Sequence, residues 1–166
     1  MKKFTALTLL VGVFMFLSCE GPSGSPGPAG EDGEIIVSGA FEIEENFTAT
    51  NNYRFTENYG FNVYPFDVTL VYMLWETDNG QDVWRPLPQT VIFDDDTTLI
   101  YNFDFTQTDV SIFMEGTVDF NTLETSYTQN QVFRVVVVPA ENVDAINTND
   151  FDVVSKTLNI SSFTIK

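Results

Sequence analysis

QVFRVVVV, residues 131–138, decides the fold of this chain, because it ends in four consecutive valines. Valine is branched at Cβ and favours extended backbone over helix. Successive side chains of a strand point to opposite faces, so a run without a polar position indicates a strand that is buried on both sides. Pro139 has no backbone N–H and ends the run. We therefore expect a central strand here.

The rest of the chain from Glu34 onward also has the pattern of strands and turns. Apolar residues alternate with polar ones, or form short bursts between Asn, Asp, Gly and Thr. Besides residues 131–138, the pattern predicts strands at residues 35–43, 53–55 with 61–64, 66–76, 83–87, 90–93, 99–105 and 110–115. Strands at this spacing predict an all-β domain over residues 34–166, with an immunoglobulin-like β-sandwich as the expected architecture.

One segment near the C-terminus departs from this pattern. In residues 150–158, positions 151, 154 and 158 are apolar at helical spacing, behind Asn149 or Asp150 as a capping residue. Because positions 153, 154 and 157 are β-branched, a further strand competes with a short helix. Residues 159–166 are expected to form a terminal strand.

A hairpin is predicted around Asn79-Gly80, since this dipeptide favours a two-residue type I′ turn. The turn would pair residues whose numbers add up to 159, and so would place Trp75 opposite Trp84. Two facing indoles could form a flat platform for a sugar ring, or could be a packing pair that stabilises the sheet. Glu76 and Arg85 would form a surface ion pair on the other face.

The N-terminus has the features of a lipoprotein signal. Lys2 and Lys3 precede an apolar run over residues 7–17, and the only cysteine, Cys19, follows directly after Phe-Leu-Ser. A plain secretory signal or a membrane-spanning helix is the alternative, but the run is too short to span and no small-x-small cleavage site is present. We expect residues 1–18 to be removed and Cys19 to be the site of lipidation, so that the chain contacts the membrane through its lipid.

Glycine occupies every third position from Gly21 to Gly33. Only glycine fits on the axis of a collagen triple helix, and the prolines between the glycines favour polyproline II backbone. So few triplets do not form a stable trimer alone, and residues 19–33 are expected to be a disordered, semi-extended tether. Trimerisation driven by the folded domain is the alternative.

The lipidation signal, followed at once by glycine triplets and then by a β-rich domain, resembles the collagen-like outer-membrane lipoproteins of Bacteroidota. The resemblance implies a protein of the cell envelope that is anchored in the outer membrane and faces the periplasm or the cell exterior. In addition, Asp96-Thr97-Thr98 resembles the Asp-Thr-x acceptor for O-glycosylation in that group. The resemblance thus implies Thr97 as a glycosylation site.

Charge and composition exclude several classes of function. The whole chain has a net charge of −17, and loss of Lys2 and Lys3 with the signal leaves −19. Such a surface repels nucleic acid. The chain has no histidine, the commonest general base and transition-metal ligand, and its lone cysteine cannot form an internal disulfide. We expect no cofactor.

Acidic residues supply the remaining candidates. Asp94, Asp95 and Asp96 form one turn that could offer oxygens to calcium, although a solvated turn is the simpler interpretation, since calcium takes about six to eight ligands. A hydrolase would have to use carboxylates alone, and Glu76 and Glu115 are the acids nearest to strand interiors. Nothing in the sequence brings these two glutamates together.

The sequence therefore predicts a tethered, monomeric or weakly oligomeric lipoprotein of the outer membrane. We expect a non-catalytic binding or structural accessory of the cell envelope, with an envelope protein or a glycan as its partner. The alternatives are a carboxylate-dependent glycan hydrolase and a glycan-binding module.

Overall fold

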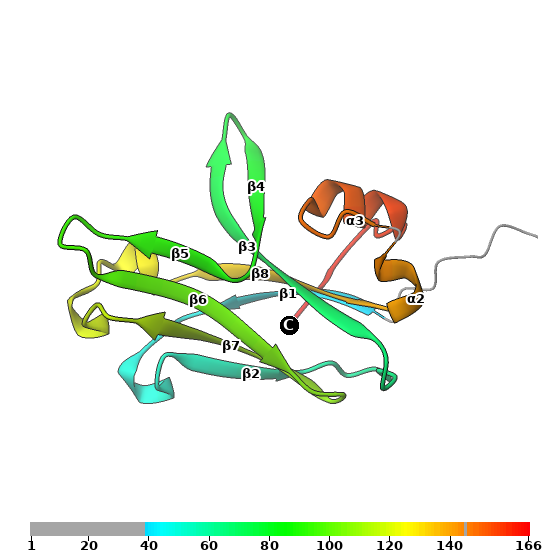
Figure 1. Cartoon of the computed structure of the whole chain (residues 1–166), viewed down its shortest axis with the longest axis horizontal. Helices are drawn as coiled ribbons and strands as arrows, with labels where there is room; N and C mark the ends of the chain where they lie inside the picture. Colours follow the sequence, from blue (N-terminus) through cyan, green and yellow to red (C-terminus); the bar gives the residue numbers. More distant parts are fainter. Residues whose placement is uncertain (1–38, 145) are drawn as a thin grey trace, which may run out of the picture. The chain divides into compact units, whose positions relative to one another are not determined.

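Two β-sheets packed face to face form the domain in the computed structural model, which describes residues 39–144 and 146–166 (Figure 1). The strands are β1 (Gly39–Glu45), β2 (Arg54–Asn58), β3 (Val68–Asp78), β4 (Gln81–Pro86), β5 (Gln89–Ile92), β6 (Thr98–Phe105), β7 (Asp109–Gly116), β8 (Gln131–Val138) and β9 (Thr164–Ile165). One sheet has the order β4-β3-β8-β1-β9, and the other has the order β2-β7-β6-β5. The predicted β-sandwich is confirmed.

Strand β8 is the central strand that the valine run predicted. It pairs antiparallel with β3 on one side and with β1 on the other. Val135 and Val137 join the core between the two sheets, whereas Val136 and Val138 belong to a second apolar cluster on the outer face of the same sheet. Because all four valines are at most 1% exposed, both faces of β8 are buried.

The core between the sheets is rich in aromatic rings. Phe47 lies at its centre, with ring centroids 5.4 Å from Phe55, 6.0 Å from Tyr101 and 6.0 Å from Phe133. The buried hydroxyl of Tyr59 forms a hydrogen bond of 2.7 Å with that of Thr69. Large interlocking side chains of this kind hold the two sheets together without any disulfide.

The outer face of the five-stranded sheet is covered by the short helix α3 (Phe151–Thr157). Its N-cap is Asp150, whose carboxylate accepts hydrogen bonds from the backbone N–H groups of residues 152 and 153. Phe151 and Val154 point inward and are 6% and 0% exposed. The helix rather than the strand interpretation is therefore confirmed for this segment. Of the terminal strand predicted at residues 159–166, only Thr164–Ile165 is a strand, β9, which is parallel to β1.

The remaining helical turns lie in the connections between strands. They are the 3-10 turns η2 (Ala49–Asn51), η3 (Phe120–Thr122) and η4 (Thr125–Tyr127), and the four-residue helix α2 (Ala140–Val143). Both η3 and η4 belong to the long connection between β7 and β8.

The predicted strand at residues 61–64 is wrong. Gly60 adopts a left-handed backbone conformation (φ 75°) that turns the chain after β2, and the following residues form an irregular connection to β3. Phe61 and Val63 still pack against the core between the sheets, and this explains the alternating pattern. The first predicted strand is observed from Gly39 on, and residues 35–38 lie outside the described part.

The resemblance to immunoglobulin domains holds for the packing of two sheets, but not for the order of the strands. Constant-type immunoglobulin domains place strands ABED in one sheet and CFG in the other. Here the chain crosses between sheets in a different sequence, since β2 and β5–β7 form one sheet while β1, β3, β4, β8 and β9 form the other.

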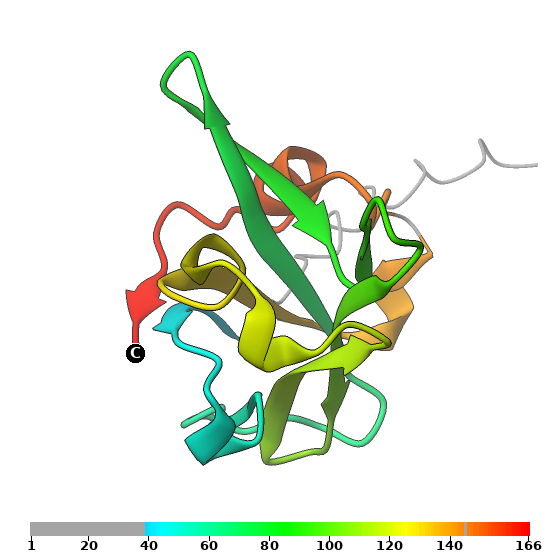
Figure 2. The same cartoon turned by 90° about the vertical axis from the view of Figure 1, so that its left-hand side faces the viewer.

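The β3–β4 hairpin projects beyond the body of the sandwich (Figure 2). Asn79 and Gly80 both have positive φ, 50° and 81°, as a type I′ turn requires, which confirms the predicted turn. The predicted register also holds next to the turn, where Asp78 pairs with Gln81 and Thr77 pairs with Asp82. A bulge between Leu74 and Glu76 then shifts the pairing by one residue.

Candidate functional site

The bulge in β3 separates the two tryptophans, so the predicted pairing of Trp75 with Trp84 is wrong. Trp84 pairs with Leu74 instead. Trp75 packs against the core between the sheets, with the guanidinium of Arg85 4.3 Å from its ring centroid. Trp84 packs against the outer cluster, with the guanidinium of Arg134 at 3.9 Å. The two rings therefore do not form a shared platform for a sugar.

The two glutamates considered for the hydrolase alternative lie in different sheets. Glu76 lies on β3 and forms the predicted ion pair with Arg85, at 3.9 Å. Glu115 lies on β7, in the other sheet, and accepts a hydrogen bond of 3.0 Å from the Asn102 side chain. Each carboxylate thus interacts with a partner of its own, Glu76 with Arg85 and Glu115 with Asn102.

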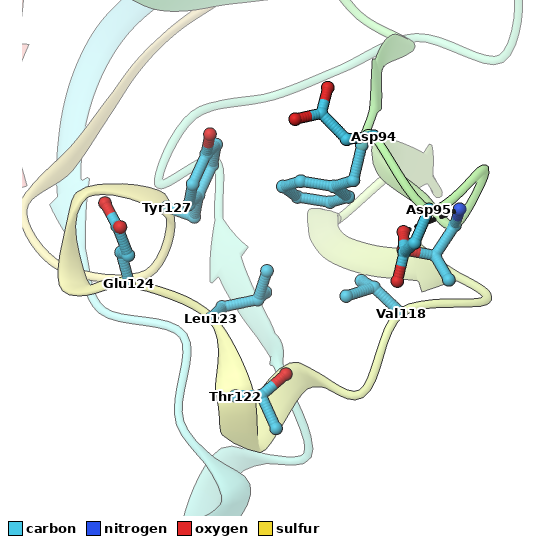
Figure 3. Close-up of a pocket in the computed structure, with 9 residues that line it drawn as sticks. Asp94, Asp95, Val118, Thr122, Leu123, Glu124 and Tyr127 are labelled. Carbon is cyan, nitrogen blue, oxygen red and sulfur yellow. Dashed lines mark hydrogen bonds between the residues drawn. The ribbon is translucent and has the colours of Figure 1, made fainter.

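The acidic turn, by contrast, lies at a pocket. A cavity of about 410 Å³ opens between the β5–β6 turn and the β7–β8 connection (Figure 3). We call it the acidic-aromatic pocket; its lining residues are Phe93, Asp94, Asp95, Thr97, Val118, Thr122, Leu123, Glu124 and Tyr127. Of the predicted site residues, it brings together Asp94, Asp95 and Thr97, whereas Asp96 does not line it.

Hydrogen bonds within the β5–β6 turn fix one wall of the pocket. Asp96 has a positive φ of 63°, and the N–H of Phe93 donates to the carbonyl of Thr97 at 2.9 Å. The Asp95 carboxylate accepts bonds from the Thr97 hydroxyl at 2.6 Å and from its N–H at 3.0 Å. These bonds lower the pKa of the exposed Asp95 carboxyl below its ordinary value, which keeps it charged at neutral pH.

The β7–β8 connection forms the opposite wall. Asp119 caps η3 by accepting a hydrogen bond from the N–H of Asn121. The buried Tyr101 hydroxyl donates to the carbonyl of Tyr127 at 2.7 Å, and this bond holds η4 against the sheet. The rings of Tyr127 and Phe93 meet edge to face, with centroids 5.5 Å apart. The aromatic contact thus joins the two walls of the pocket.

The pocket combines an apolar floor with a rim of hydrogen-bonding groups. Phe93, Val118, Leu123 and Tyr127 supply the apolar side chains, all of them partly buried. Figure 3 shows Glu124 on one side and the two aspartates on the other. Carboxylates accept hydrogen bonds from hydroxyl and ammonium groups, and aromatic rings pack against apolar faces of ligands. This arrangement suits a polar ligand that has an apolar face.

The described residues contain no group of three His, Cys, Asp or Glu side chains that could hold a metal ion. The predicted lipidation site, Cys19, and the tether of residues 19–33 lie outside the described residues. Within residues 39–144 and 146–166, no helix is long and apolar enough to cross a membrane.

Most basic side chains of the described chain take part in ion pairs. Four of the five lie within 4 Å of a carboxylate: Arg54–Asp104 at 3.2 Å, Arg85–Glu76 at 3.9 Å, Arg134–Glu42 at 2.9 Å and Lys166–Glu57 at 3.1 Å. Because each of these positive charges is matched at close range, the many other carboxylates dominate the electrostatic field of the surface.

Sequence reasoning did not find Leu123, Glu124 or Tyr127 as site residues. The available signal was the length of the connection between β7 and β8, residues 117–130, which has no strand pattern of its own. Connections of this length within a compact domain often carry function.

Comparison with known proteins adds no relative. No family model, no curated protein and no solved structure matches the chain.

Proposed function

We propose that this protein is a non-catalytic lipoprotein of the bacterial outer membrane, anchored through Cys19, whose β-sandwich binds a glycan in the acidic-aromatic pocket. The observation that carries the proposal is the composition of that pocket, in which carboxylates and threonine hydroxyls surround an apolar floor with two aromatic rings. Sugars offer the matching chemistry, because their hydroxyl groups donate hydrogen bonds while their C–H faces pack on aromatic rings.

The charge of the pocket limits the class of glycan. Asp94, Asp95 and Glu124 line it, and none of the described basic residues does. An acidic sugar would bring a further negative charge next to these three carboxylates and would be repelled. Neutral sugars and amino sugars are therefore the proposed ligands.

The test is binding to immobilised glycans that include neutral, amino and acidic sugars. The variant Asp94→Asn, Asp95→Asn, Glu124→Gln removes the charges of the rim. A matched variant, Glu44→Gln with Asp78→Asn and Asp144→Asn, removes as many exposed charges elsewhere. Loss of two or three charge-assisted hydrogen bonds should weaken binding by at least about tenfold. The matched variant should bind like the wild type.

Two results would count against a glycan site in this pocket. One is binding of acidic sugars as strong as that of neutral sugars. The other is equal binding by the rim variant and the wild type.

A carboxylate-dependent glycan hydrolase is the second candidate, because carboxylates approach the pocket from two walls. Hydrolysis needs one protonated acid and one ionised carboxylate on either side of the scissile bond. The lowered pKa of Asp95 makes that residue a poor proton donor at neutral pH. Release of new reducing ends from a bound oligosaccharide would establish hydrolysis, whereas recovery of the intact oligosaccharide supports binding alone.

We further propose that the Thr97 hydroxyl, if it is glycosylated, carries its glycan at the mouth of the same pocket. The attached sugar would replace the hydroxyl proton that Asp95 now accepts and would occupy space that a ligand needs. Glycosylation and ligand binding therefore exclude each other. The mass of the peptide that contains residues 94–98, from protein made in its natural host, shows whether Thr97 is glycosylated. Protein with a glycan on Thr97 should not bind the ligand.

A further inference from the structure

The connection between β2 and β3 contains Phe66, the most exposed large apolar side chain of the described structure. Phe66 is 81% exposed and Tyr64 is 66% exposed, with Pro65 between them. We call these three residues the aromatic tip. Exposure of large apolar side chains to water is unfavourable, and two of them in one turn indicate a surface that contacts an apolar environment.

The aromatic tip is held in a defined turn. The Asp67 carboxylate accepts a hydrogen bond of 2.9 Å from the N–H of Tyr64, and the N–H of Asp67 donates to the carbonyl of Tyr64 at 3.0 Å. Pro65 fixes its own φ angle. The two aromatic side chains are therefore presented by a closed turn, so little conformational entropy is lost when they bind.

The tip lies at the end of the sandwich where β1 begins. Gly39 is in the same row of the sheet as Val137 and Thr69, and Thr69 is near the start of β3. Gly39 also packs on the ring of Phe61, so closely that a Cβ on residue 39 would lie 2.4 Å from that ring. Figure 1 shows the β2–β3 connection and the start of β1 on the same side of the domain.

The acidic-aromatic pocket lies at the opposite end. Strand β6 starts at Thr98, next to the pocket, and ends at Phe105. The turn that follows β6 contacts the β2–β3 connection, because the carbonyl of Thr108 accepts a hydrogen bond from the N–H of Tyr59. Eight residues of extended strand separate the two ends by roughly 27 Å.

We infer that the aromatic tip inserts into the interfacial zone of the lipid bilayer and orients the domain with its pocket facing away from the membrane. The inference rests on the lipid anchor of the proposed function. The described chain begins at Gly39, at the same end of the domain as the tip, so the segment that leads to the proposed anchor at Cys19 is attached to the domain at this end. Tyrosine and tryptophan are enriched at the boundary between headgroups and acyl chains, and phenylalanine adds apolar area there.

The lipid that fits this tip is zwitterionic. Residues 59–67 contain no Lys or Arg, and Lys166, which lies beside Gly60, is paired with Glu57. The strongly acidic surface of the domain would be repelled by anionic headgroups. The contact is therefore apolar in nature, and we expect it to depend little on salt.

The experiment uses the full-length acylated protein in vesicles of phosphatidylethanolamine and phosphatidylcholine. An environment-sensitive fluorophore is attached to a cysteine introduced by Asn62→Cys, beside the tip, or by Thr122→Cys, at the pocket end; both positions are exposed. The label at position 62 should shift to shorter wavelength and be quenched by lipid-borne nitroxides, whereas the label at position 122 should report water.

Two variants test whether the aromatic side chains cause the shift. Tyr64→Ser with Phe66→Ser should return the label at position 62 to the emission of the label at position 122. Ile92→Ser removes an apolar side chain that is 71% exposed on β5, and should leave the shift unchanged.

Each outcome decides the inference. A label at position 62 that reports water in acylated protein overturns membrane insertion and leaves the anchor intact, while an unmodified Cys19 in the mass of the N-terminal peptide overturns the anchor as well. A shift in native outer-membrane fragments but not in pure lipid vesicles means that the tip binds a membrane component that these vesicles lack, and it overturns the proposed contact with zwitterionic lipid. Glycan binding is measured separately and is unaffected by either result.

Discussion

Replacing Phe151 by alanine should strongly destabilise the domain, because this ring connects helix α3 to the outer face of the sheet. Phe151 is 6% exposed, and its ring centroid lies 5.1 Å from that of Tyr72, 5.5 Å from that of Trp84 and 5.8 Å from that of Phe163. The guanidinium of Arg134 lies 5.0 Å from the same ring. The substitution would remove all of these contacts at once.

The magnitude follows from burial and from the cavity that remains. Phenylalanine-to-alanine changes in protein cores cost about 3 to 5 kcal/mol. Because α3 spans only residues 151–157 and lies near the chain end, it can move partly into the vacated space, and we expect about 3 kcal/mol, at the lower end of that range. Such a loss is a large part of the roughly 5 to 15 kcal/mol that stabilises a typical domain.

The assay is urea unfolding of the purified protein, followed by tryptophan fluorescence, since Trp84 contacts Phe151. Val153→Ala is the matched control on the same helix, where the side chain is 37% exposed, and its effect should stay within about 0.5 kcal/mol. A loss of less than about 1 kcal/mol for Phe151→Ala, with an unchanged dependence on urea, would refute the packing of α3 on the sheet.

Three further predictions concern the pocket and its supports. Gly116→Ala should lower the melting temperature and reduce the free energy of unfolding by more than about 2 kcal/mol. The reason is that φ is +139° and a Cβ would lie 2.0 Å from a carbonyl oxygen of β6. A variant as stable as the wild type would contradict this. Thr97→Ala should raise the pKa of the Asp95 carboxyl toward its ordinary value of 3.8, as followed by carbon-13 NMR titration, and an unchanged titration would show that Thr97 is not its main donor. Tyr101→Phe should cost about 1 to 2 kcal/mol by leaving the Tyr127 carbonyl unpaired. Since burial raises the pKa of Tyr101 above its ordinary value of 10.0, the unfolded phenol ionises first; the wild type should lose stability above about pH 10, and the variant should lose less on alkaline unfolding.

Local pattern was sufficient to predict most of the fold. The valine run, the Asn79-Gly80 turn and the capping Asp150 each depend on a property of a few neighbouring residues, and the structure contains the element that each predicted. The bulge at Trp75 was not predictable in this way, because a strand with or without an extra residue has the same composition. One inserted residue was enough to move the two tryptophans to opposite faces.

The pocket could be predicted only in part. Asp94, Asp95 and Thr97 were identified because one turn contains them all. Leu123, Glu124 and the ring of Tyr127 reach the same place through 3-10 turns whose position depends on a long-range hydrogen bond from Tyr101. Such a contact between residues far apart in the sequence leaves no periodic signal in either segment.

Four of the five basic side chains of the described chain are paired with acidic partners, and this affects how two copies of the domain interact. With few unpaired positive charges to attract a neighbour, two copies would repel each other wherever they met. At physiological ionic strength the repulsion extends only about 8 Å from each surface. Copies of the domain would therefore collide without clustering, and a lower salt concentration would keep them further apart.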